Sequence, residues 1–524
     1  MPNNFTDRRF LIPAALAVLV LLFGFRCYRT WRVFNDTADE AVHIEAGLEF
    51  LQTRHYTREA QHPPLARVIL AIPPYTAGLR YSVHWPLWTG SSPAFYWRTL
   101  SLARLGNLVW APFLIAYVYL WGRRLHGPAA GLAAATLVSF SPNLLAHASL
   151  ATLDFGAATA IFVASYYFWR WSEDPKMANC LLAALAFGVA ILIKFSALMI
   201  LPPIAFAFFL TSHSRLSSLL SLLSSVSFVA VVALLVWAAY LFEVGRLSTP
   251  QFQPAQGSFG QNLEHRVAGL VGDHDIPAPR FWRGVLDVIG HNAHGHQTYL
   301  LGRLGQYGWW YYFPVALALK STLPMLAVVG LSLVACGLRG QRLYPLLAAA
   351  MLLVVCMASS INLGVRHILA IYPFFAVLAS GLFVAKGWLR ITVLVLLLWH
   401  AGESVAAHPD YLAYFNETVR GREDQFLLDS NLDWGQDLER LRRYLVEHNI
   451  TSVYLSYFGR ADPARIGIPG IQPLTPGLRP KGWVVVSKAH IAGLALPGGH
   501  GLTWLKTYPP TARIGKSILV YYFP

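Results

Sequence analysis

Two adjacent acids, Asp39 and Glu40, follow the first long apolar stretch of the chain. They open a helix-compatible segment in which Asp39 and His43 are four residues apart and therefore share one face. A carboxylate at a membrane surface can act as a general base toward the hydroxyl of a lipid-borne substrate. The same pattern is also typical of a solvated amphipathic helix with Asp39 as its N-cap, so spacing alone leaves both interpretations open.

A third acid, Asp154, stands between two apolar stretches in the sequence Thr152-Leu-Asp154-Phe. An ionisable group at the end of a membrane span is costly unless it is paired or hydrated, so it often marks a functional site. The alternative interpretation is that Asp154 only caps the helix that follows it.

Several cationic side chains stand at comparable positions. Lys194 lies between two apolar stretches, Lys320 lies just inside another, and Arg366 with His367 precedes a fourth. Such groups suit the binding of phosphate or pyrophosphate at a membrane surface. The alternative is that they extend toward lipid head groups without a specific ligand.

Histidines form a third set of candidates. His291, His294 and His296 lie within six residues, whereas His43 and His62 lie far upstream. Three histidines at this spacing can bind zinc, although no cysteine or HExxH companion occurs. We treat His43, His294 and His296 as weak metal candidates and expect hydrogen bonds to phosphate or sugar hydroxyls equally. The sequence requires no cofactor but leaves a divalent metal open.

The composition identifies the elements that must position these residues. Of 524 residues, 55% are apolar and only 13% are charged, whereas soluble domains carry about 25% charge. This excludes a disordered chain, and four cysteines are too few for a disulfide scaffold. The net charge of +15 is explained by cytoplasmic loops and contact with membrane lipids, and we expect no nucleic-acid partner. The sequence therefore predicts a polytopic α-helical membrane protein.

About eleven membrane spans are predicted, because a bilayer core needs about 20 apolar helical residues. They fall near 10–26, 100–121, 128–147, 155–170, 179–194, 196–211, 216–241, 312–336, 343–360, 367–386 and 388–405. The first is not a cleavable signal peptide, since no small-residue cleavage site follows it.

Basic residues in alternate short loops predict the orientation. One set of loops holds Arg8, Arg9, Arg123, Arg124, Arg170, Lys176, Arg215, Arg339, Arg342, Lys386 and Arg390. We expect this side to be cytoplasmic, with the N-terminus inside and the C-terminus outside. The predicted location is a bacterial cytoplasmic (inner) membrane.

Three long segments are predicted outside the membrane: 27–99, 242–311 and 406–524. Residues 1–405 would form the membrane module with its two outside loops, and residues 406–524 an extracytoplasmic α/β domain. In this tail we expect strands at Phe426–Asp429, Val453–Phe458, Trp483–Ser487 and Ile514–Tyr522. Asp433 is placed to cap a helix from Trp434 to about Glu447, so this turn is predicted to be structural.

The order of these motifs resembles the GT-C superfamily of membrane glycosyltransferases. The resemblance is to glycosyltransferase family 39, which includes protein O-mannosyltransferases and bacterial aminoarabinose lipid A transferases. It rests on Asp39-Glu40, His62-Pro-Pro-Leu, Thr152-Leu-Asp154, Lys194, Gly295-His296 with Tyr299, Gly308-Trp-Trp-Tyr-Tyr-Phe-Pro with Lys320, Asn362-Leu-Gly-Val-Arg366-His367, and Asp429-Ser-Asn-Leu-Asp433-Trp434-Gly435-Gln436.

The resemblance implies a GT-C fold and a sugar donor linked to polyprenyl phosphate. A hexosyl or pentosyl group would pass with inversion to a hydroxyl of a lipid, glycan or protein acceptor outside the membrane. Asp39 would be the general base, with Glu40 and Asp154 as further acids. Cations would stabilise the leaving phosphate. The candidates for that role are Arg366, His367, Lys194, His62, His296 and Lys320.

One departure concerns His62, because the lipid A transferases carry a lysine before the same Pro-Pro-Leu sequence. A histidine is neutral for part of its range near pH 7, which argues against a main phosphate ligand and against a lipid A acceptor.

A secondary transporter or lipid flippase is the rival interpretation, since many spans with few charges also fit that class. Against it, the charges gather on one side of the membrane, and no inverted repeat is visible. We expect Asp39, Asp154 and Arg366 to line one external cavity in an enzyme, and a midplane site in a transporter.

Overall fold

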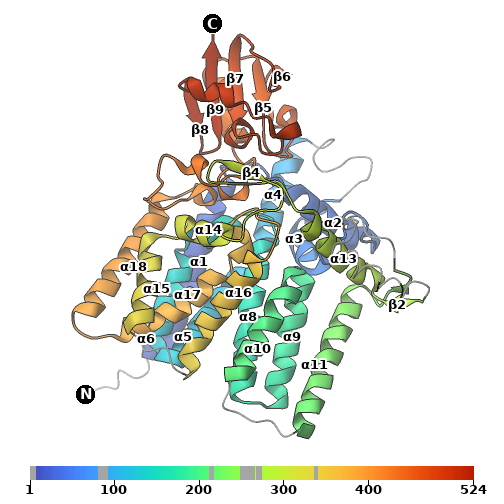
Figure 1. The fold of residues 1–524 in the computed structure, drawn as a ribbon, viewed down its shortest axis with the longest axis vertical. Helices are drawn as coiled ribbons and strands as arrows, with labels where there is room; N and C mark the ends of the chain where they lie inside the picture. The colour runs from blue at the N-terminus through green and yellow to red at the C-terminus, as the bar shows by residue number, and fades with distance from the viewer. Residues whose placement is uncertain are drawn as a thin grey trace.

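The computed structural model describes residues 7–80, 92–211, 218–247, 274–335 and 340–524, together with the single residues 266 and 269. Figure 1 shows a helical body at the N-terminal end of the long axis and a strand-containing tail at the other end. Parts of both predicted outside loops, at 81–91 and across most of 248–273, lie outside the described residues, as does the end of the predicted span 312–336.

The body is built from apolar helices, most of which run roughly along one direction, whereas α14 (Tyr312–Lys320) lies across them (Figure 1). They are α1 (Asp7–Trp31), α5 (Trp110–His126), α6 (Pro128–Ser139), α7 (Pro142–Ala148), α8 (Asp154–Glu173), α9 (Met177–Ile193), α10 (Ser196–Thr211), α11 (Ser218–Ala239), α14 (Tyr312–Lys320), α15 (Leu323–Ala335), α16 (Tyr344–Met357), α17 (Ile371–Ala379) and α18 (Trp388–Ala406).

Shorter elements lie between the body and the tail. They are α2 (Glu40–Thr53), α3 (Pro64–Thr76), α4 (Pro93–Asn107), α13 (Pro279–His294), the 3-10 helix η2 (Val365–Ile368) and the two-stranded pairs β1 (Val244–Gly245) with β2 (Ile276–Pro277) and β3 (Thr298–Leu300) with β4 (Arg303–Gly305). Two further 3-10 helices, η1 (Gly340–Leu343) and η3 (Ser380–Val384), adjoin α16 and α17.

Close backbone contacts hold together the short helices α2, α3 and α4, which lie between α1 and α5 in the sequence. Pro64 occupies the first position of α3, where its missing amide hydrogen costs nothing. Gly47 of α2 lies against the Arg67 carbonyl of α3, and a Cβ at Gly106 of α4 would lie 2.6 Å from the carbonyl oxygen of Ile69. These glycines let α2, α3 and α4 pack as one unit.

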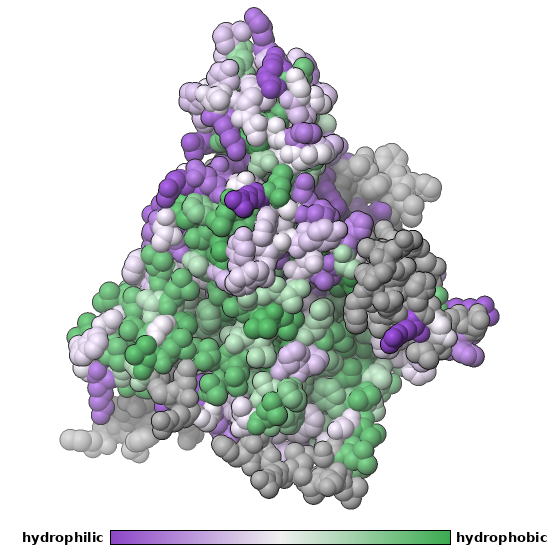
Figure 2. Space-filling model, viewed as in Figure 1, coloured by the Kyte–Doolittle hydropathy of each residue, from purple (hydrophilic) through white to green (hydrophobic). Residues whose placement is uncertain are grey.

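Each predicted span overlaps a helix, but the count of eleven is not confirmed. Among the described residues, five helices are long and apolar enough to cross a bilayer, or seven if two bent pairs each count as one. The bent pairs are α6 with α7, at 61°, and α14 with α15, at 111°. Figure 2 shows hydrophobic side chains gathered over this body and hydrophilic ones over the tail. The chain is thus a multi-pass membrane protein.

The tail contains a five-stranded mixed sheet in the order β6-β5-β7-β9-β8. Its strands are β5 (Val453–Ser456), β6 (Ile471–Pro473), β7 (Gly482–Ser487), β8 (Ala512–Ile514) and β9 (Ile518–Phe523). β5 is parallel to β6 and β7, and β9 is antiparallel to β7 and β8. The helices α19 (Leu438–Glu447), α20 (Pro463–Ile466) and α21 (Lys488–Ile491) accompany it, with the 3-10 helices η4 (Tyr411–Ala413), η5 (Glu423–Gln425), η6 (Asp429–Asn431), η7 (Pro497–Gly499) and η8 (Thr503–Thr507).

Three predictions for the tail need correction. Phe426–Asp429 is not a strand but makes a single bridge, Leu300 with Leu427, before η6. Ile514–Tyr522 is a hairpin and not one strand, because Gly515 turns the chain at a φ of +56°. α19 begins at Leu438 after Asp437, so Asp433 is not its cap.

The tail packs directly onto the body. Leu438 and Leu441 of α19 and Val485 of β7 belong to the same buried apolar cluster as the body helices. A second cluster, with Val484, Val486 and neighbouring side chains, covers the other face of the sheet. One continuous core therefore joins the tail to the elements that carry the charged residues.

Candidate active site

Four charged residues meet where helices begin and end. Asp39 immediately precedes α2, Asp154 is the first residue of α8, Lys194 immediately follows α9, and Arg366 lies in η2. Helix ends place charged side chains at the boundary of the apolar body, where water and a substrate can reach them. This placement differs from a site in the middle of continuous apolar helices.

Arg366 joins the two acids. One terminal nitrogen, Nη1, lies 2.6 Å from Oδ2 of Asp39 and 3.7 Å from Oδ2 of Asp154. Lys194 donates from Nζ to Oδ1 of Asp154 at 2.6 Å. Two carboxylates and two cations thus form a chain of ion pairs from Asp39 to Lys194, which we call the Arg366 cluster.

Exposure differs along the Arg366 cluster. The side chain of Asp39 is 32% exposed, that of Lys194 17%, that of Arg366 9% and that of Asp154 3%. Asp39 therefore keeps part of its side chain open to solvent, whereas Asp154 is enclosed between two cations. Within the described part of the chain, the Asp39 side chain makes no cap hydrogen bond to α2, and Asp154 lies inside α8 after its N-cap, Leu153.

Glu40 lies in a different environment from its neighbour. Its carboxylate is fully buried and pairs through both oxygens with Arg104, at 2.8 Å each. The same oxygens accept hydrogen bonds from the amide and hydroxyl of Thr37 and from the amide of Ala151, at 2.6–3.1 Å. This saturation does not fit the predicted catalytic contact. Glu40 instead ties the segment before α2 to the loop that leads into Asp154.

His62 and His43 stack edge to face, with ring centroids 5.2 Å apart. His62 contacts Glu59 at 3.1 Å, and Arg67 ion-pairs with the same carboxylate and donates to Nδ1 of His43 at 3.3 Å. Burial, together with the charge of Lys194, lowers the pKa of His62 to about 4. Burial, with Arg67, also holds the pKa of His43 well below its usual range. Both rings are neutral near pH 7, so neither supplies a cation to a phosphate.

The other histidines do not form a metal centre with these two. His296 contacts His291 through Nδ1 and Nε2 at 3.2 Å, and burial lowers the pKa of both imidazoles. His294 contributes its carbonyl to Gln306 at 3.4 Å. No group of three or more potential ligands that could hold a metal ion occurs among the residues that the structure describes. Metal dependence stays a prediction.

Lys320 is enclosed at the junction with the tail. Its Nζ is fully buried and donates to the carbonyl oxygens of Leu412, at 2.8 Å, and Asn431, at 2.6 Å. The ammonium also lies 4.4 Å from the centre of the Phe415 ring. These contacts do not fit the predicted phosphate ligand, because they occupy the ammonium inside the protein. His367 follows Arg366 in η2 and packs its ring 6.1 Å from that of Phe313.

Two tail residues complete the surroundings of Arg366. The Trp434 ring lies 4.3 Å from the Arg366 guanidinium carbon and is 2% exposed. Asp429 is a non-glycine residue at a φ of +54°. Burial raises the pKa of its carboxyl to about 6, although Arg366 opposes that shift. Trp434 belongs to the Asp433–Gln436 turn that was predicted from the sequence to be structural, and its contact with Arg366 is not encoded in local spacing.

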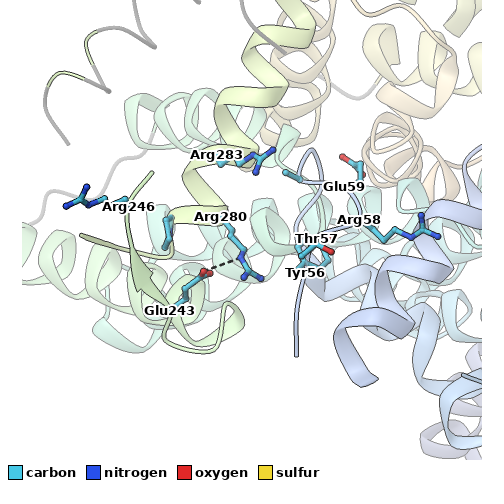
Figure 3. A pocket seen from close by; sticks show the side chains of 10 residues that line it. Tyr56, Thr57, Arg58, Glu59, Glu243, Arg246, Arg280 and Arg283 are labelled. Atoms are coloured by element: carbon cyan, nitrogen blue, oxygen red, sulfur yellow. Dashed lines mark ion pairs between the residues drawn. The ribbon is translucent and has the colours of Figure 1, made fainter. Parts of the chain in front are cut away.

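A cavity of about 300 Å³ lies between the first and second outside segments, and Figure 3 shows the side chains that line this cavity. It is lined by Tyr56, Thr57, Arg58, Glu59, Ala60, Glu243, Arg246, Pro279, Arg280 and Arg283. Glu243 pairs with Arg280 at 3.1 Å, as the dashed line marks. A second cavity of about 350 Å³ lies between α4 and the tail. Neither of these two cavities is lined by Asp39, Asp154 or Arg366, so the shared cavity predicted for them stays a prediction, although the three side chains are in contact.

Comparisons with known proteins agree with the fold. Residues 98–240 match the model of a family described as dolichyl-phosphate-mannose-protein mannosyltransferase. A sequence comparison with curated proteins gave no significant match. Among solved structures, the chain is similar to ArnT from Cupriavidus metallidurans bound to undecaprenyl phosphate, with a TM-score of 0.54, 12% identity, and 97% of each chain covered.

The same protein in the apo state gives a TM-score of 0.50 with 13% identity, over 96% of this chain and 97% of that one. The oligosaccharyltransferase of Archaeoglobus fulgidus in the apo form gives a TM-score of 0.49 with 15% identity, over 91% of this chain and 62% of that one. The chain thus has, end to end, a fold similar to that of ArnT, and part of its body matches a family of membrane mannosyltransferases.

Proposed function

We propose that the protein transfers a sugar from a polyprenyl-phosphate donor to an acceptor hydroxyl, with inversion, on the extracytoplasmic side of the membrane. The observation that carries this proposal is the contact between the part-exposed Asp39 carboxylate and the largely buried Arg366 guanidinium. A base and a phosphate-binding cation are the two groups that such a reaction needs most. The bound undecaprenyl phosphate in the similar ArnT structure supports the class of donor.

The proposed reaction is a single displacement. The acceptor oxygen attacks the anomeric carbon while the bond from that carbon to the phosphate oxygen breaks, and its electron pair leaves with the phosphate. Asp39 accepts the proton of the acceptor hydroxyl, which makes the oxygen a better nucleophile as the bond forms. The polyprenyl phosphate needs no strong general acid, because it leaves as a stable anion.

Arg366 has two partners in succession in this proposal. In the structure it is paired with Asp39, which occupies the base. A donor phosphate competes for the guanidinium, and the planar fork of arginine binds such a group through two oxygens. The Asp39 carboxylate is then free to accept a proton from the acceptor. Donor binding would therefore release the Asp39 carboxylate from Arg366 and make it available as a base. Before the donor binds, the carboxylate stays paired.

The remaining residues support this pair. Asp154 contacts both Arg366 and Lys194 and thereby links the two cations beside Asp39. We assign Glu40 and Lys320 to the framework, since both are saturated by protein partners. The neutral rings of His62 and His296 suit hydrogen bonds to sugar or phosphate oxygens. The proposed mechanism uses no metal.

The proposed location is the bacterial cytoplasmic membrane, with the N-terminus inside and the tail outside. It rests on the basic loops of the sequence and on the position of the Arg366 cluster beside the hydrophilic tail. Single cysteines in place of Ser359 and of Arg124 would test it in whole cells. An impermeant maleimide should label only the first, and the reverse result would place the site on the cytoplasmic side.

The decisive experiment for the function compares cells with and without the gene. Mass spectrometry of their glycolipids and glycoproteins should reveal one sugar modification that disappears with the gene and returns with the intact chain. A purified protein should then transfer that sugar from the polyprenyl-phosphate donor. Unchanged glycans together with altered uptake or translocation of a lipid would instead favour the transporter.

A further inference from the structure

A short tail segment, residues 429–438, contacts both halves of the base–cation pair. It begins in η6, ends at the first residue of α19 and is buried along most of its length. Its contacts reach Asn35 and Ala38 just before Asp39, and Leu363 and Val365 just before Arg366. These partners are separated by more than 300 residues from one another in the sequence, so the segment connects them through space.

The first set of contacts holds the segment that carries Asp39. The Trp434 carbonyl accepts a hydrogen bond from the amide of Ala38 at 3.1 Å. The Asn35 side chain donates to the Gly435 carbonyl at 2.7 Å and accepts from the amide of Leu438 at 2.8 Å. Three hydrogen bonds thus fix the backbone immediately before the base.

The second set holds the loop that carries Arg366. The Asn431 side chain accepts from the amide of Val365 at 3.0 Å, and the Ser430 hydroxyl donates to the Leu363 carbonyl at 2.6 Å. Gly364 has a φ of 159°, and a Cβ there would collide with the Ser430 oxygen. The loop therefore packs closely against the tail segment at Gly364.

Trp434 contributes its ring as well as its backbone. The Arg366 guanidinium lies over the ring face at 4.3 Å, while its edge is directed to Asp39 and Asp154. Stacking on an aromatic face fixes the plane of a guanidinium and leaves its N–H groups free for acceptors in that plane. The Nε of Arg366 is buried and has no hydrogen-bond partner among the described residues, which leaves a donor for a ligand.

We propose that Trp434 is a positioning residue of the transfer reaction, and that the tail segment 429–438 is part of the active site. The inference rests on the proposed function. Trp434 acts through Arg366: it sets the guanidinium plane so that a donor phosphate can take the place of Asp39. The tail thereby takes part in transfer through a contact that the helices of the body do not supply.

The test uses two tryptophans of the same tail in the same kind of contact. Arg479 lies 4.3 Å from the Trp504 ring centre, which matches the distance from Arg366 to Trp434. Trp434→Leu, Trp434→Phe and Trp504→Leu would be compared for turnover, donor binding and thermal midpoint, with a polyprenyl-phosphate sugar and the acceptor found in the cell comparison. Leucine removes the ring face, whereas phenylalanine keeps a smaller one.

We expect Trp434→Leu to weaken donor binding and to lower turnover about 10- to 30-fold, the value of a desolvated cation–π contact. Trp434→Phe should recover most of this loss, and Trp504→Leu should transfer at the wild-type rate even if its thermal midpoint falls. Equal losses in Trp434→Phe and Trp434→Leu, or normal donor binding in both, would overturn the positioning role. A wild-type protein that transfers no sugar would instead contradict the proposed function itself.

Discussion

Asp39 and Glu40 are neighbours in the sequence, but their carboxylates differ in exposure and in hydrogen bonding. Asp39 is 32% exposed and contacts one terminal nitrogen of Arg366. Glu40 is fully buried, makes a two-oxygen ion pair with Arg104 and accepts three further hydrogen bonds. The two carboxylates have the same chemistry, so their environments alone decide what each can do.

The two carboxylates differ in their remaining capacity to accept hydrogen bonds. All the acceptor directions of the Glu40 carboxylate are used by hydrogen bonds. Loss of this carboxylate would leave the buried Arg104 guanidinium without its counter-ion. Asp39 keeps exposed oxygen surface and a partner that a phosphate can displace. A saturated buried ion pair fixes geometry, whereas an unsaturated pair at the boundary of the body can exchange its partner during a reaction.

The largest effect on stability should follow from breaking the buried pair. Glu40→Ala leaves the buried Arg104 charge without its carboxylate, although Arg104 still donates to the carbonyls of Phe34 and Asn35, and should lower the free energy of unfolding by about 3–5 kcal/mol. Thermal unfolding of the purified protein in detergent measures it. The matched control is Glu439→Ala, whose partners Arg442 and Arg443 are 35% and 59% exposed, and it should cost no more than about 1 kcal/mol. Equal losses would remove the distinction between the two kinds of pair.

Arg366→Lys should have the next largest effect, and on donor binding. The substitution keeps the charge but loses the planar fork and the stacking on Trp434, which should weaken donor binding about 10- to 100-fold. Titration of the purified variant with the polyprenyl-phosphate donor measures the loss. Wild-type affinity would reduce Arg366 to a general positive charge near the lipid head groups.

Lys194→Met should act indirectly and less strongly. Without Lys194, Asp154 draws Arg366 away from Asp39, and turnover should fall about tenfold, the effect of a hydrogen bond between charged groups. Lys176→Met is the control, since it removes a 3.1 Å pair with Asp174 in which the lysine side chain is 75% exposed. Steady-state rates that are the same in both variants would show that Lys194 does not support the cluster.

A further effect on stability concerns Asp433 and pH. Burial raises the pKa of its carboxyl from about 3.8 to about 8. The folded state therefore binds this proton more tightly than the unfolded state, and stability is lost as pH rises from about 4 to about 8. The thermal midpoint of the wild type should fall as pH rises across this range. The midpoint of Asp433→Asn, measured in the same way, should fall less. Parallel curves for the two proteins would contradict the assignment.

The charged residues of the site could be located from the sequence, but their partners could not. Ionisable groups at the ends of apolar stretches are costly unless they are paired or hydrated, so they often mark functional sites. This argument could select Asp39, Asp154, Lys194 and Arg366. Their pairing depends on the arrangement of four distant elements, which spacing does not encode. The order of the motifs carried the resemblance to a known superfamily, and that resemblance implied the fold. The contacts between the charged residues are visible only in the structure.

Three residues have partners that lie far away in the sequence. Glu40 looked catalytic beside Asp39 because its partner Arg104 is 64 positions away in the sequence. Lys320 looked like a phosphate ligand because the carbonyls that bind it belong to the tail. Trp434 looked like part of a turn because Arg366 lies in another element. Only Gly515, which breaks the predicted last strand, gave a local signal that could have been read.

The most direct test of the central claim is a single-turnover measurement on Asp39→Asn with the donor already bound. Asparagine keeps the shape and removes only the base, so the bound donor should remain while transfer falls about 10²- to 10⁴-fold. The account predicts normal or tighter donor binding, because Arg366 no longer has to leave a carboxylate. A transfer rate close to that of the wild type would contradict it and would assign proton removal to another group.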